Sequence, residues 1–236
     1  MLIRCKIAGK NVMVFGDNTQ HEPVNSRLCD NPNFYNLMFD THLPYNTNNY
    51  RNNFSVKYYD ELRQTNKNIC NNNEFFGKKR LNEVLKYNTE WDKAEVILAY
   101  TRDTRDKYNK LMCEKLGIKS LGDNGAKIIC KSNDLRELNI YYNFCYDVIN
   151  NGKTIILNNG VDKIELEPKF LKYFDYSYAR TTHSVQGQTL KSFHYCIEDI
   201  KFLGGRGLYT LISRLKHEKP VIKKVEIKKK ILFFKK

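Results

Sequence analysis

The chain has 236 residues, of which 41% are hydrophobic, and this suffices for one large domain or for one domain with a small satellite. Lysine and arginine number 40 against 26 acidic residues, and the net charge of +14 favours a polyanionic partner, either nucleic acid or an anionic membrane. A solvated basic surface, or a coding bias toward Lys, Asn, Tyr and Ile, would give the same excess without a partner.

The cysteines and the apolar runs exclude several classes of protein. The seven cysteines are scattered and odd in number, with no C-x-x-C pair, which favours reduced thiols over a disulfide framework or a zinc site. No apolar run approaches the length of a membrane span, and residues 12–15 are too short for the core of a signal peptide. We therefore expect a protein of the cytoplasm, nucleus or a viral factory that is not secreted, with no metal site and no membrane partner.

The N-terminal half contains two strand-like runs. Residues 11–15 predict a short buried strand. Residues 26–90 are polar and rich in Asn and Tyr, and we interpret them as a connecting region with one or two short helices. Residues 94–100 predict a second buried strand, followed by a helix that ends at Gly117. The apolar positions of this helix have helical spacing and are Tyr108, Leu111, Met112 and Leu116. A strand followed by an amphipathic helix is one half of a parallel α/β unit.

Strand-like patterns dominate between about residues 120 and 170. Three short runs have this composition, at 127–130, 154–157 and 163–166. Turns that contain Asn-Gly pairs accompany them and predict hairpins, at 123–125, 151–152 and 159–160. This stretch therefore predicts a small β insertion.

The C-terminal part returns to the α/β pattern. Residues 193–197 alternate as a strand does, and a glycine-rich turn follows at 204–207. The next helix carries one apolar face, made of Leu208, Leu211, Ile212 and Leu215. Residues 221–236 predict an edge strand or a basic tail. The predicted fold class is therefore α/β, a parallel sheet flanked by helices with a small β insertion.

Two segments place polar side chains at the carboxyl ends of strands, where open α/β sheets bind ligands. Asp17 and Gln20 follow the strand at 11–15, although an ordinary strand-to-turn connection would use the same residues. Residues 179–190 (ARTTHSVQGQTL) gather hydroxyls, an imidazole, amides and a glycine, and such groups can hold phosphate oxygens. Helix capping by Thr and Ser would explain the hydroxyls but not the histidine, amide and glycine together.

Two arginines complete the candidates. Arg214 lies about 100–120° from the centre of the apolar face of its helix, which predicts a cation held rigidly at the boundary of the core. Arg51 follows Asn49 and Tyr50 in a polar stretch, where a lone arginine is usually a surface residue.

In their order, these segments resemble superfamily-one helicases, particularly the RecD-like and Dda-like branch and its viral relatives. The matching segments are residues 16–24 (GDNTQHEPV, like motif III), 49–51 (NYR, motif IV), 98–102 with Asn109 (LAYTR, the start of the second motor domain), 178–189 (YARTTHSVQGQT, motif V) and 208–214 (LYTLISR, motif VI). The motif V segment is the most specific match, and the resemblance spans about residues 11–218.

The resemblance implies a domain organisation and a function. Residues 1–25 would be a remnant of a first RecA-like domain, 26–90 a connecting region and 91–236 the second RecA-like helicase domain, with its β insertion at about 120–170. The implied function is that of the C-terminal motor domain of an ATP-dependent DNA helicase, which supplies arginine fingers and single-strand contacts. A strand in 1–25 would lack its neighbours, so we expect this segment to be poorly ordered or to pack against the second domain.

The resemblance also implies residue roles. Gln20 would sense the γ-phosphate, and Arg51 and Arg214 would be catalytic arginine fingers, typically worth about 10³–10⁵ in rate. The residues implied on the ATP side are Asp17, Gln186 and Gly187. Those implied to contact the nucleic acid are Thr101, Arg102, Thr182 and His183. The chain departs from the family pattern at His21 (usually Leu), Arg102 (usually Asn) and residues 210–212 (usually Val-Ala-Leu), and His21 puts the packing behind Gln20 in doubt.

The sequence contains no G-x-x-x-x-G-K-[ST] phosphate loop, and no Asp-Glu magnesium pair precedes Gly16. Gly152-Lys153-Thr154 does not qualify, because Asp147 stands where the first glycine should be and the flanks predict a hairpin. The reacting phosphates would not be positioned, so we expect this chain alone to hydrolyse no ATP. ATP and Mg²⁺ would be bound mainly by an absent half, which leaves open a split gene with a separate partner chain, a fragment or a decayed reading frame.

Two other functions stay open. One is a viral RNA helicase domain, and the other is a stand-alone single-strand-binding module that uses basic residues and tyrosines without chemistry. The expected partner is single-stranded nucleic acid, with DNA favoured. Recognition through phosphates and stacking does not itself decide between DNA and RNA.

Overall fold

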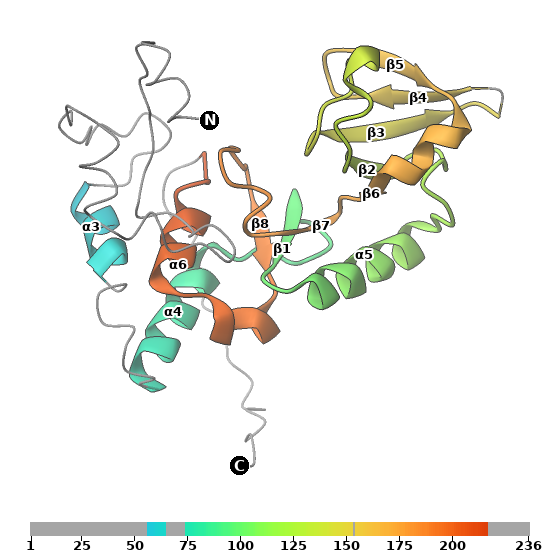
Figure 1. Cartoon of the computed structure of the whole chain (residues 1–236). Coiled ribbons are helices and arrows are strands. Elements are labelled where there is room, and N and C mark those ends of the chain that lie inside the picture. The colour runs from blue at the N-terminus through green and yellow to red at the C-terminus, as the bar shows by residue number, and fades with distance from the viewer. Residues whose placement is uncertain (1–55, 65–73, 153, 217–236) are drawn as a thin grey trace, which may run out of the picture.

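Two sheets organise the described part of the chain. The computed structural model describes residues 56–64, 74–152 and 154–216. One sheet is parallel, with three strands in the order β7-β1-β8, and the other is antiparallel, with five strands in the order β5-β4-β3-β2-β6 (Figure 1). Several predictions lie outside the described residues: the strand at 11–15, the roles of Asp17, Gln20 and Arg51, the order or packing of residues 1–25, and the tail at 221–236.

The parallel sheet is short and covered on both faces. Its strands are β1 (Val96–Ala99), β7 (Ala179–Thr181) and β8 (Phe193–Tyr195). All of β1 is buried, as its unbroken apolar run predicts for a strand with two covered faces. Val96 and Leu98 belong to one hydrophobic cluster, whereas Ile97 and Ala99 belong to another. Alternate side chains of β1 therefore serve two cores.

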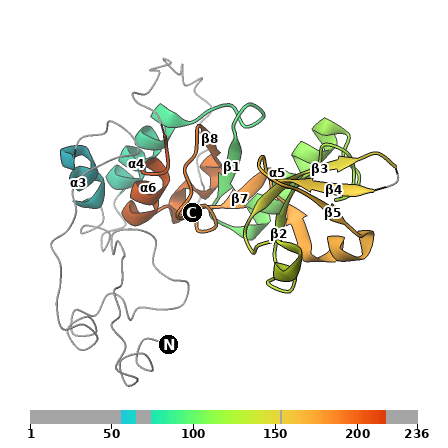
Figure 2. The same ribbon diagram turned by 90° about the horizontal axis from the view of Figure 1, so that it is seen from above.

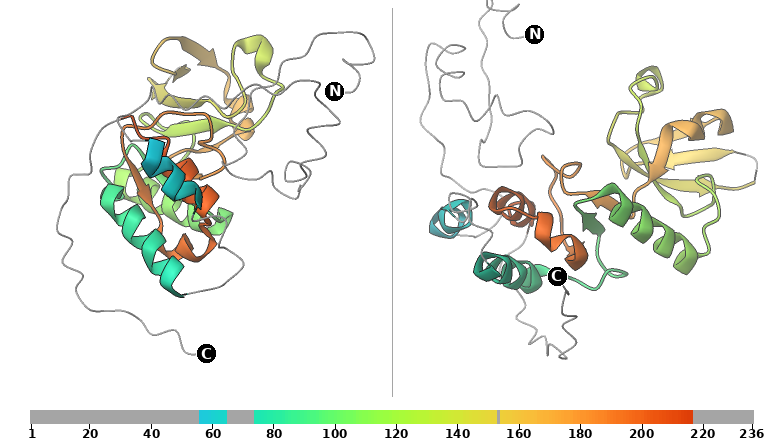
Figure 3. Two further views of the ribbon diagram at one scale, coloured as in Figure 1. Left: turned by 90° about the vertical axis from the view of Figure 1, so that its left-hand side faces the viewer. Right: turned by 60° about the horizontal axis from the view of Figure 1, so that its bottom comes forward.

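Helices form the outer layers, and their bounds are α3 (Val56–Gln64), α4 (Glu74–Tyr87), α5 (Arg102–Leu116) and α6 (Gly205–Ile212). α5 covers the face of Ile97 and Ala99 through Tyr108 and Met112. α3, α4 and α6 lie side by side on the other face (Figure 3, left), and their side chains share one core with β1 and β8. Part of the predicted connecting region is thus packed on the parallel sheet.

The helix predicted after β1 is confirmed, and it ends at the predicted stop, Gly117. Thr101 caps α5 by accepting a hydrogen bond from the Thr104 N–H, and Gly117 ends it with a positive φ of 70°. The N–H of Gly117 donates to the carbonyls of Cys113 and Glu114. The glycine signal for the stop is local, so it could be recognised without the tertiary structure, whereas the capping role of Thr101 was not predicted.

The start and end of α6 correct two expectations. Gly205, Arg206 and Gly207 form the first turn of α6, where a glycine-rich turn was predicted. α6 ends at Ile212, so Leu215 is not on the helix; it pairs instead with Leu190. Gly205 and Gly207 are both buried in the first turn of α6.

The β insertion follows α5 and returns to the parallel sheet through β6 (Figures 1 and 2). Its strands are β2 (Lys127–Cys130), β3 (Cys145–Asn150), β4 (Ile155–Asn158), β5 (Lys163–Leu166) and β6 (Phe174–Tyr176). The hairpin turns predicted near Gly152 and Gly160 are confirmed, since they join β3 to β4 and β4 to β5. The turn at residues 123–125 is not a hairpin: it joins α5 to β2, and the Asp123 carboxylate accepts hydrogen bonds from the N–H groups of Lys119 and Ser120.

The predicted fold class is confirmed: an α/β protein with a parallel sheet flanked by helices and a small β insertion. Three short 3₁₀ helices complete the description, η2 (Arg136–Leu138), η3 (Pro168–Tyr173) and η4 (Ile197–Phe202). Among the helices described, none is long and apolar enough to cross a membrane.

Candidate nucleic-acid interface

The three parallel strands end at one edge of their sheet, and the candidate residues leave from that edge. β1 is followed by Tyr100 and Thr101, β7 by Thr182 and His183, and β8 by a segment that contains Asp199. Because parallel strands share their direction, these segments must meet at the carboxyl edge of the sheet, where α/β folds bind ligands. The contacts below show that they do meet.

Asp199 fixes the start of α5. Its buried carboxylate accepts hydrogen bonds from the N–H groups of Tyr100 (2.6 Å) and Thr101 (2.9 Å) and from the hydroxyl of Thr104 (2.9 Å). This negative charge lies at the N-terminus of α5, where the helix dipole favours it. The N–H of Thr101 is therefore already bonded. The Asp199 carboxylate, which the sequence reasoning missed, lies at the start of α5, where Thr101 was expected to contact a phosphate of the nucleic acid.

Aromatic rings connect the ends of the three strands. The Tyr100 ring contacts the His183 ring edge-to-face at 5.7 Å and stacks on the Phe202 ring at 5.6 Å. Phe202 is 43% exposed, and the Lys201 ammonium lies 4.8 Å from its ring centre. Burial lowers the pKa of the His183 imidazole below its ordinary value, so this half-buried ring is neutral at neutral pH. Tyr100 and Phe202 are further residues that sequence reasoning did not select.

The segment after β7 folds back on itself in a tight turn of residues 181–188. The Ser184 hydroxyl donates to the Thr181 carbonyl (2.8 Å), and the Gln186 N–H donates to the His183 carbonyl (3.2 Å). Gln186 and Gly187 are exposed, and Gly187 has a φ of +86° that favours glycine. The Thr182 hydroxyl, in contrast, is enclosed by protein, so it is not accessible to a ligand in this conformation.

Arg180 lies beneath this turn as a buried cation. Its guanidinium donates to the Ser184 carbonyl (2.7 Å), the Gln188 side-chain oxygen (2.8 Å) and the Asn143 side-chain oxygen (3.4 Å). No carboxylate forms an ion pair with it within the part of the chain that the structure describes, and its Nε has no hydrogen-bond acceptor there. A buried charge without a counter-charge is unfavourable unless an anion comes near.

Other cations belong to the neighbouring segments, and Lys131 lies near Arg180. Arg102 is exposed at the first position of α5, and Arg105 lies one turn later in an ion pair with Asp106 (2.7 Å). Burial lowers the pKa of the Lys131 ammonium, and the nearby charges of Arg105 and Arg180 lower it further, whereas Asp175 raises it. Arg105, Lys131 and Arg180 are therefore neighbouring cations, with Asp106 and Asp175 as acidic neighbours, and cations of this kind suit phosphate groups.

Arg214 does not lie where the helical geometry predicted. α6 ends at Ile212, so Arg214 follows the helix, is 4% exposed and donates from its guanidinium to the Ser213 hydroxyl (3.1 Å). The expectation of a cation at the boundary of the core is thus wrong. The predicted angle of Arg214 around the helix axis assumed that the helix continues through residue 214, whereas α6 ends two residues before it. Its carbonyl accepts a hydrogen bond from the Leu190 N–H (2.8 Å), so its main chain adjoins the end of residues 179–190.

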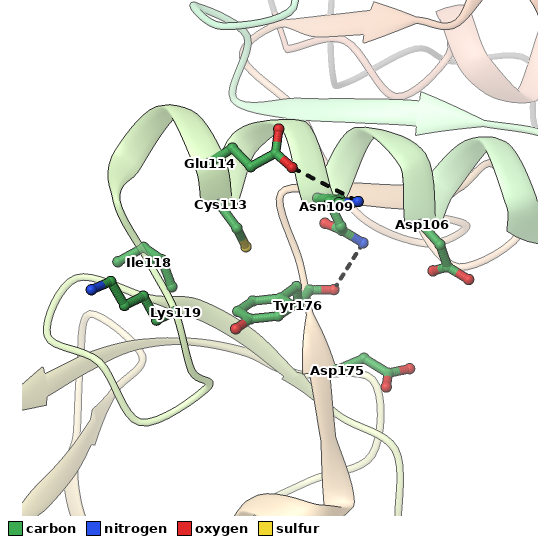
Figure 4. A pocket seen from close by; sticks show the side chains of 9 residues that line it. Asp106, Asn109, Cys113, Glu114, Ile118, Lys119, Asp175 and Tyr176 are labelled. Atoms are coloured by element: carbon green, nitrogen blue, oxygen red, sulfur yellow. Dashed lines mark hydrogen bonds and ion pairs between the residues drawn. The ribbon is translucent and has the colours of Figure 1, made fainter.

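Asn109 has a structural role at the amino end of β7, opposite to the carboxyl edge of the sheet. Its side-chain oxygen accepts a hydrogen bond from the Ala179 N–H (2.7 Å), and its amide donates to the Ala179 carbonyl (3.1 Å). These bonds tie α5 to β7. Asn109 also lines a cavity of about 370 Å³ between α5 and β6 (Figure 4), whose charged lining has both signs: Asp106, Glu114 and Asp175 against Lys110 and Lys119. The described residues contain no group of His, Cys, Asp or Glu placed to hold a metal ion.

Comparison with known proteins gives matches to solved structures alone. No family model and no curated protein matches the chain. Bacteroides Pif1 bound to single-stranded DNA matches at 13% identity and a TM-score of 0.44, over 70% of this chain and 49% of that chain. The Pif1 helicase from Candida albicans matches at 13% identity and 0.40, over 69% and 50%. Bacteroides sp Pif1 in complex with ADP-AlF4 matches at 15% identity and 0.35, over 67% and 47%. The chain spans about half the length of these structures.

Proposed function

We propose that this chain supplies the second, RecA-like motor domain of a superfamily-one DNA helicase and that it holds a single strand at the carboxyl edge of its parallel sheet. The observation that carries the proposal is Arg180, a buried guanidinium without a carboxylate partner among the described residues, which bonds the turn of residues 181–188 at the Ser184 carbonyl. A strand phosphate on this turn would provide the missing negative charge. The order of the motif-like segments supports the same assignment.

The strand contacts follow from the geometry of that edge. Arg102 and the turn residue His183 present donors to the backbone phosphates, and the exposed Phe202 ring offers a surface to a base. Thr101 and Thr182 contribute main-chain position more than side-chain contact, since Asp199 bonds the first and protein encloses the second. Recognition of this kind is independent of base sequence, with a dissociation constant of about 10⁻⁴–10⁻⁶ M and a strong dependence on salt.

ATP hydrolysis requires a second component in this proposal. Gln186 and Gly187 would line the nucleotide side of the cleft, and Arg214 would act as an arginine finger after its guanidinium leaves the Ser213 hydroxyl. ATP and Mg²⁺ would be held by a half that carries a phosphate loop, in a separate chain or in the same protein. The 236 residues alone would hydrolyse no ATP, because their sequence has no phosphate loop.

Two measurements test the proposal. The first is the fluorescence anisotropy of a labelled oligothymidylate titrated with the chain at several salt concentrations: affinity should fall as salt rises, with a slope of about −0.7 for each phosphate contacted. The second is single-strand-stimulated ATPase, which should be absent from the chain alone and appear with a half that carries the phosphate loop. Arg214→Ala should lower that ATPase by about 10³–10⁵ with little change in strand binding. ATPase from the chain alone, or no salt-dependent binding, contradicts the proposal.

A stand-alone single-strand-binding module, without nucleotide chemistry, is the second candidate. Its residues would be those of the same edge, without a nucleotide role for Arg214. Arg214→Ala distinguishes the two candidates. The binding module is supported if this substitution weakens strand binding and if no ATPase activity appears when a half with a phosphate loop is added. Matched oligouridylate and oligothymidylate titrations separate an RNA partner from a DNA partner, because the 2′-hydroxyl distinguishes the two.

A further inference from the structure

An aromatic turn of the β insertion stands out on the protein surface. Within residues 141–144, which connect η2 to β3, Tyr141 is 46% exposed, Tyr142 54% and Phe144 52%. Three large aromatic side chains exposed within four residues leave considerable apolar surface in water, and such patches mark binding sites. The sequence analysis assigned them no role.

Hydrogen bonds and ring contacts within the turn and with Tyr146 hold the Tyr141 and Phe144 side chains. The Phe144 N–H donates to the Tyr141 carbonyl (3.2 Å), and Asn143 has the positive φ (64°) that asparagine tolerates in turns. The Tyr141 N–H donates to the hydroxyl of the buried Tyr146 (3.2 Å). The Phe144 ring contacts those of Tyr141 (6.1 Å) and Tyr146 (6.5 Å), which joins the exposed rings to the core of the insertion. Binding to such a surface loses little conformational entropy.

Hydrogen bonds fasten this aromatic turn to the phosphate-binding edge. The Asn143 side-chain amide donates to the Ser184 carbonyl (2.8 Å), and the same carbonyl accepts from Arg180 (2.7 Å). Arg180 also donates to the Asn143 side-chain oxygen (3.4 Å) and to the Cys145 sulfur (3.3 Å). The aromatic turn and the turn of residues 181–188 thus share one buried cation.

The charge around the aromatic turn indicates the occupant. Lys131, at the end of β2, lies near Arg105 and Arg180, and the Cys130 N–H donates to the Phe144 carbonyl (3.0 Å), which places this cationic group beside the aromatic turn. A protein partner with an apolar surface would have to bury these cations, whereas a single strand brings phosphates for the cations and bases for the rings. The combination of cations and exposed rings is what single-strand-binding surfaces use.

We propose that Tyr141, Tyr142 and Phe144 form a base-stacking platform for the strand whose phosphates lie on the turn of residues 181–188. Arg180 and Asn143 are positioning residues, which hold the platform at a fixed place relative to the phosphates. This inference rests on the proposed function. The β insertion thereby contributes directly to the grip on the strand.

The test separates bases from phosphates. The full chain is titrated with oligothymidylate and with an abasic oligonucleotide of equal length, and the wild type should bind oligothymidylate at least about tenfold more tightly, as stacking on several rings predicts. The triple variant Tyr141→Ala, Tyr142→Ala, Phe144→Ala should lose that preference, bind the abasic strand as the wild type does and keep the salt slope. Phe144→Tyr should retain the preference, and Leu116→Ala, a matched exposed apolar residue on α5, should change nothing.

Asn143→Gly tests the fastening without removing a ring. Glycine accepts the positive φ, but the bond to the Ser184 carbonyl is lost, so the preference for oligothymidylate should fall several-fold while the fold and the salt slope are kept. Photocrosslinking of an oligonucleotide with 5-iododeoxyuridine should label residues 141–144. The platform is refuted if the triple variant keeps the full preference or if the crosslinks lie elsewhere. If the wild type binds neither strand, the proposed function fails together with the platform; if it binds both equally, the platform alone fails.

Discussion

The parallel sheet and the β insertion are built by different means. The parallel sheet joins strands that are far apart in sequence, since Val96 pairs with Phe193 and Ile97 with Ala179. Much of the insertion joins neighbouring strands through short turns, as at Gly152 and Gly160. Long-range pairing gathers residues from distant segments at one edge, whereas local pairing makes a small unit that carries a surface of its own. The first arrangement creates the charged edge, and the second presents the aromatic turn.

The two regions also have separate cores. Ile128, Tyr146 and Leu157 belong to the hydrophobic cluster of the insertion, and none of its members occurs in the clusters of the parallel sheet. Polar contacts link the regions, notably the bonds of Arg180 to the Asn143 side chain and of the Asn143 side chain to the Ser184 carbonyl. We therefore expect each region to respond to mutation largely by itself.

Core truncation should have the largest effect and should show whether the regions are independent. Leu157→Ala in the insertion and Leu98→Ala in the parallel sheet each remove a fully buried side chain, and each should lower the free energy of unfolding by about 2–5 kcal/mol. Native-state hydrogen exchange should locate the lost protection in the mutated region. Equal loss of protection in both regions after either substitution would show that they unfold as one unit.

The buried carboxylate of Asp199 should have the next largest effect, and only on the parallel sheet. Asp199→Ala removes three hydrogen bonds at the start of α5 and should destabilise the chain by about 1.5–3 kcal/mol in urea unfolding. Thr104→Val is the matched control, because it removes one of the same bonds and should cost about 1 kcal/mol. If both variants unfold with the wild type, Asp199 does not anchor the helix.

The same contrast explains what could be predicted from the sequence. β1, α5 and the hairpin turns have local signals: an apolar run for β1, apolar residues at helical spacing with a final glycine for α5, and Asn-Gly pairs for the turns. β3 and β6 were not predicted. Polar residues interrupt the apolar residues of β3, and β6 has only three residues, so neither has a clear strand pattern. The edge of the sheet and the motif V-like turn were located, but Asp199 was not, because its partners Tyr100 and Thr101 lie almost a hundred residues away.

Arg214 shows the limit most clearly. Its orientation was derived from helical periodicity, and the helix ends before it, so the derivation failed by two residues. The aromatic turn was missed for another reason. The sequence does not show that Tyr141, Tyr142 and Phe144 lie near residues 181–188, because this depends on the hydrogen bond from Asn143 to Ser184. Both features depend on contacts between segments that no local pattern contains.

Gly187 should have a smaller effect, confined to the turn. Gly187→Ala places a side chain at a φ of +86°, where space is open but the backbone conformation is unfavourable, so we expect a loss of about 1–2 kcal/mol. Gly187→Asn should be milder, because asparagine tolerates this region. Thermal unfolding of both variants is the measurement, and an unchanged midpoint for Gly187→Ala would mean that the turn has another conformation.

The smallest expected effect is a pH dependence of strand binding. Burial lowers the pKa of His183 in the folded chain below about 6.5, so a nearby phosphate that favours its charged form should tighten binding as pH falls below neutrality, by at most about tenfold. The folded chain alone should lose stability in the same window, because the unfolded chain takes up the proton first. His183→Gln should remove the contribution of this imidazole to the pH dependence of strand binding and to the pH dependence of stability. If the variant keeps both pH dependences in full, other titratable groups cause them.

Hydrogen exchange of the chain with and without oligothymidylate tests the central claim most directly. We predict that the strand slows exchange at the carboxyl edge of the parallel sheet, in the turn of residues 181–188, and at the aromatic turn of residues 141–144. Exchange in the β4–β5 hairpin, on the far side of the insertion in Figure 1, should be unchanged. Slowed exchange confined to that hairpin or to α3 and α4, with none at the edge, would contradict the account.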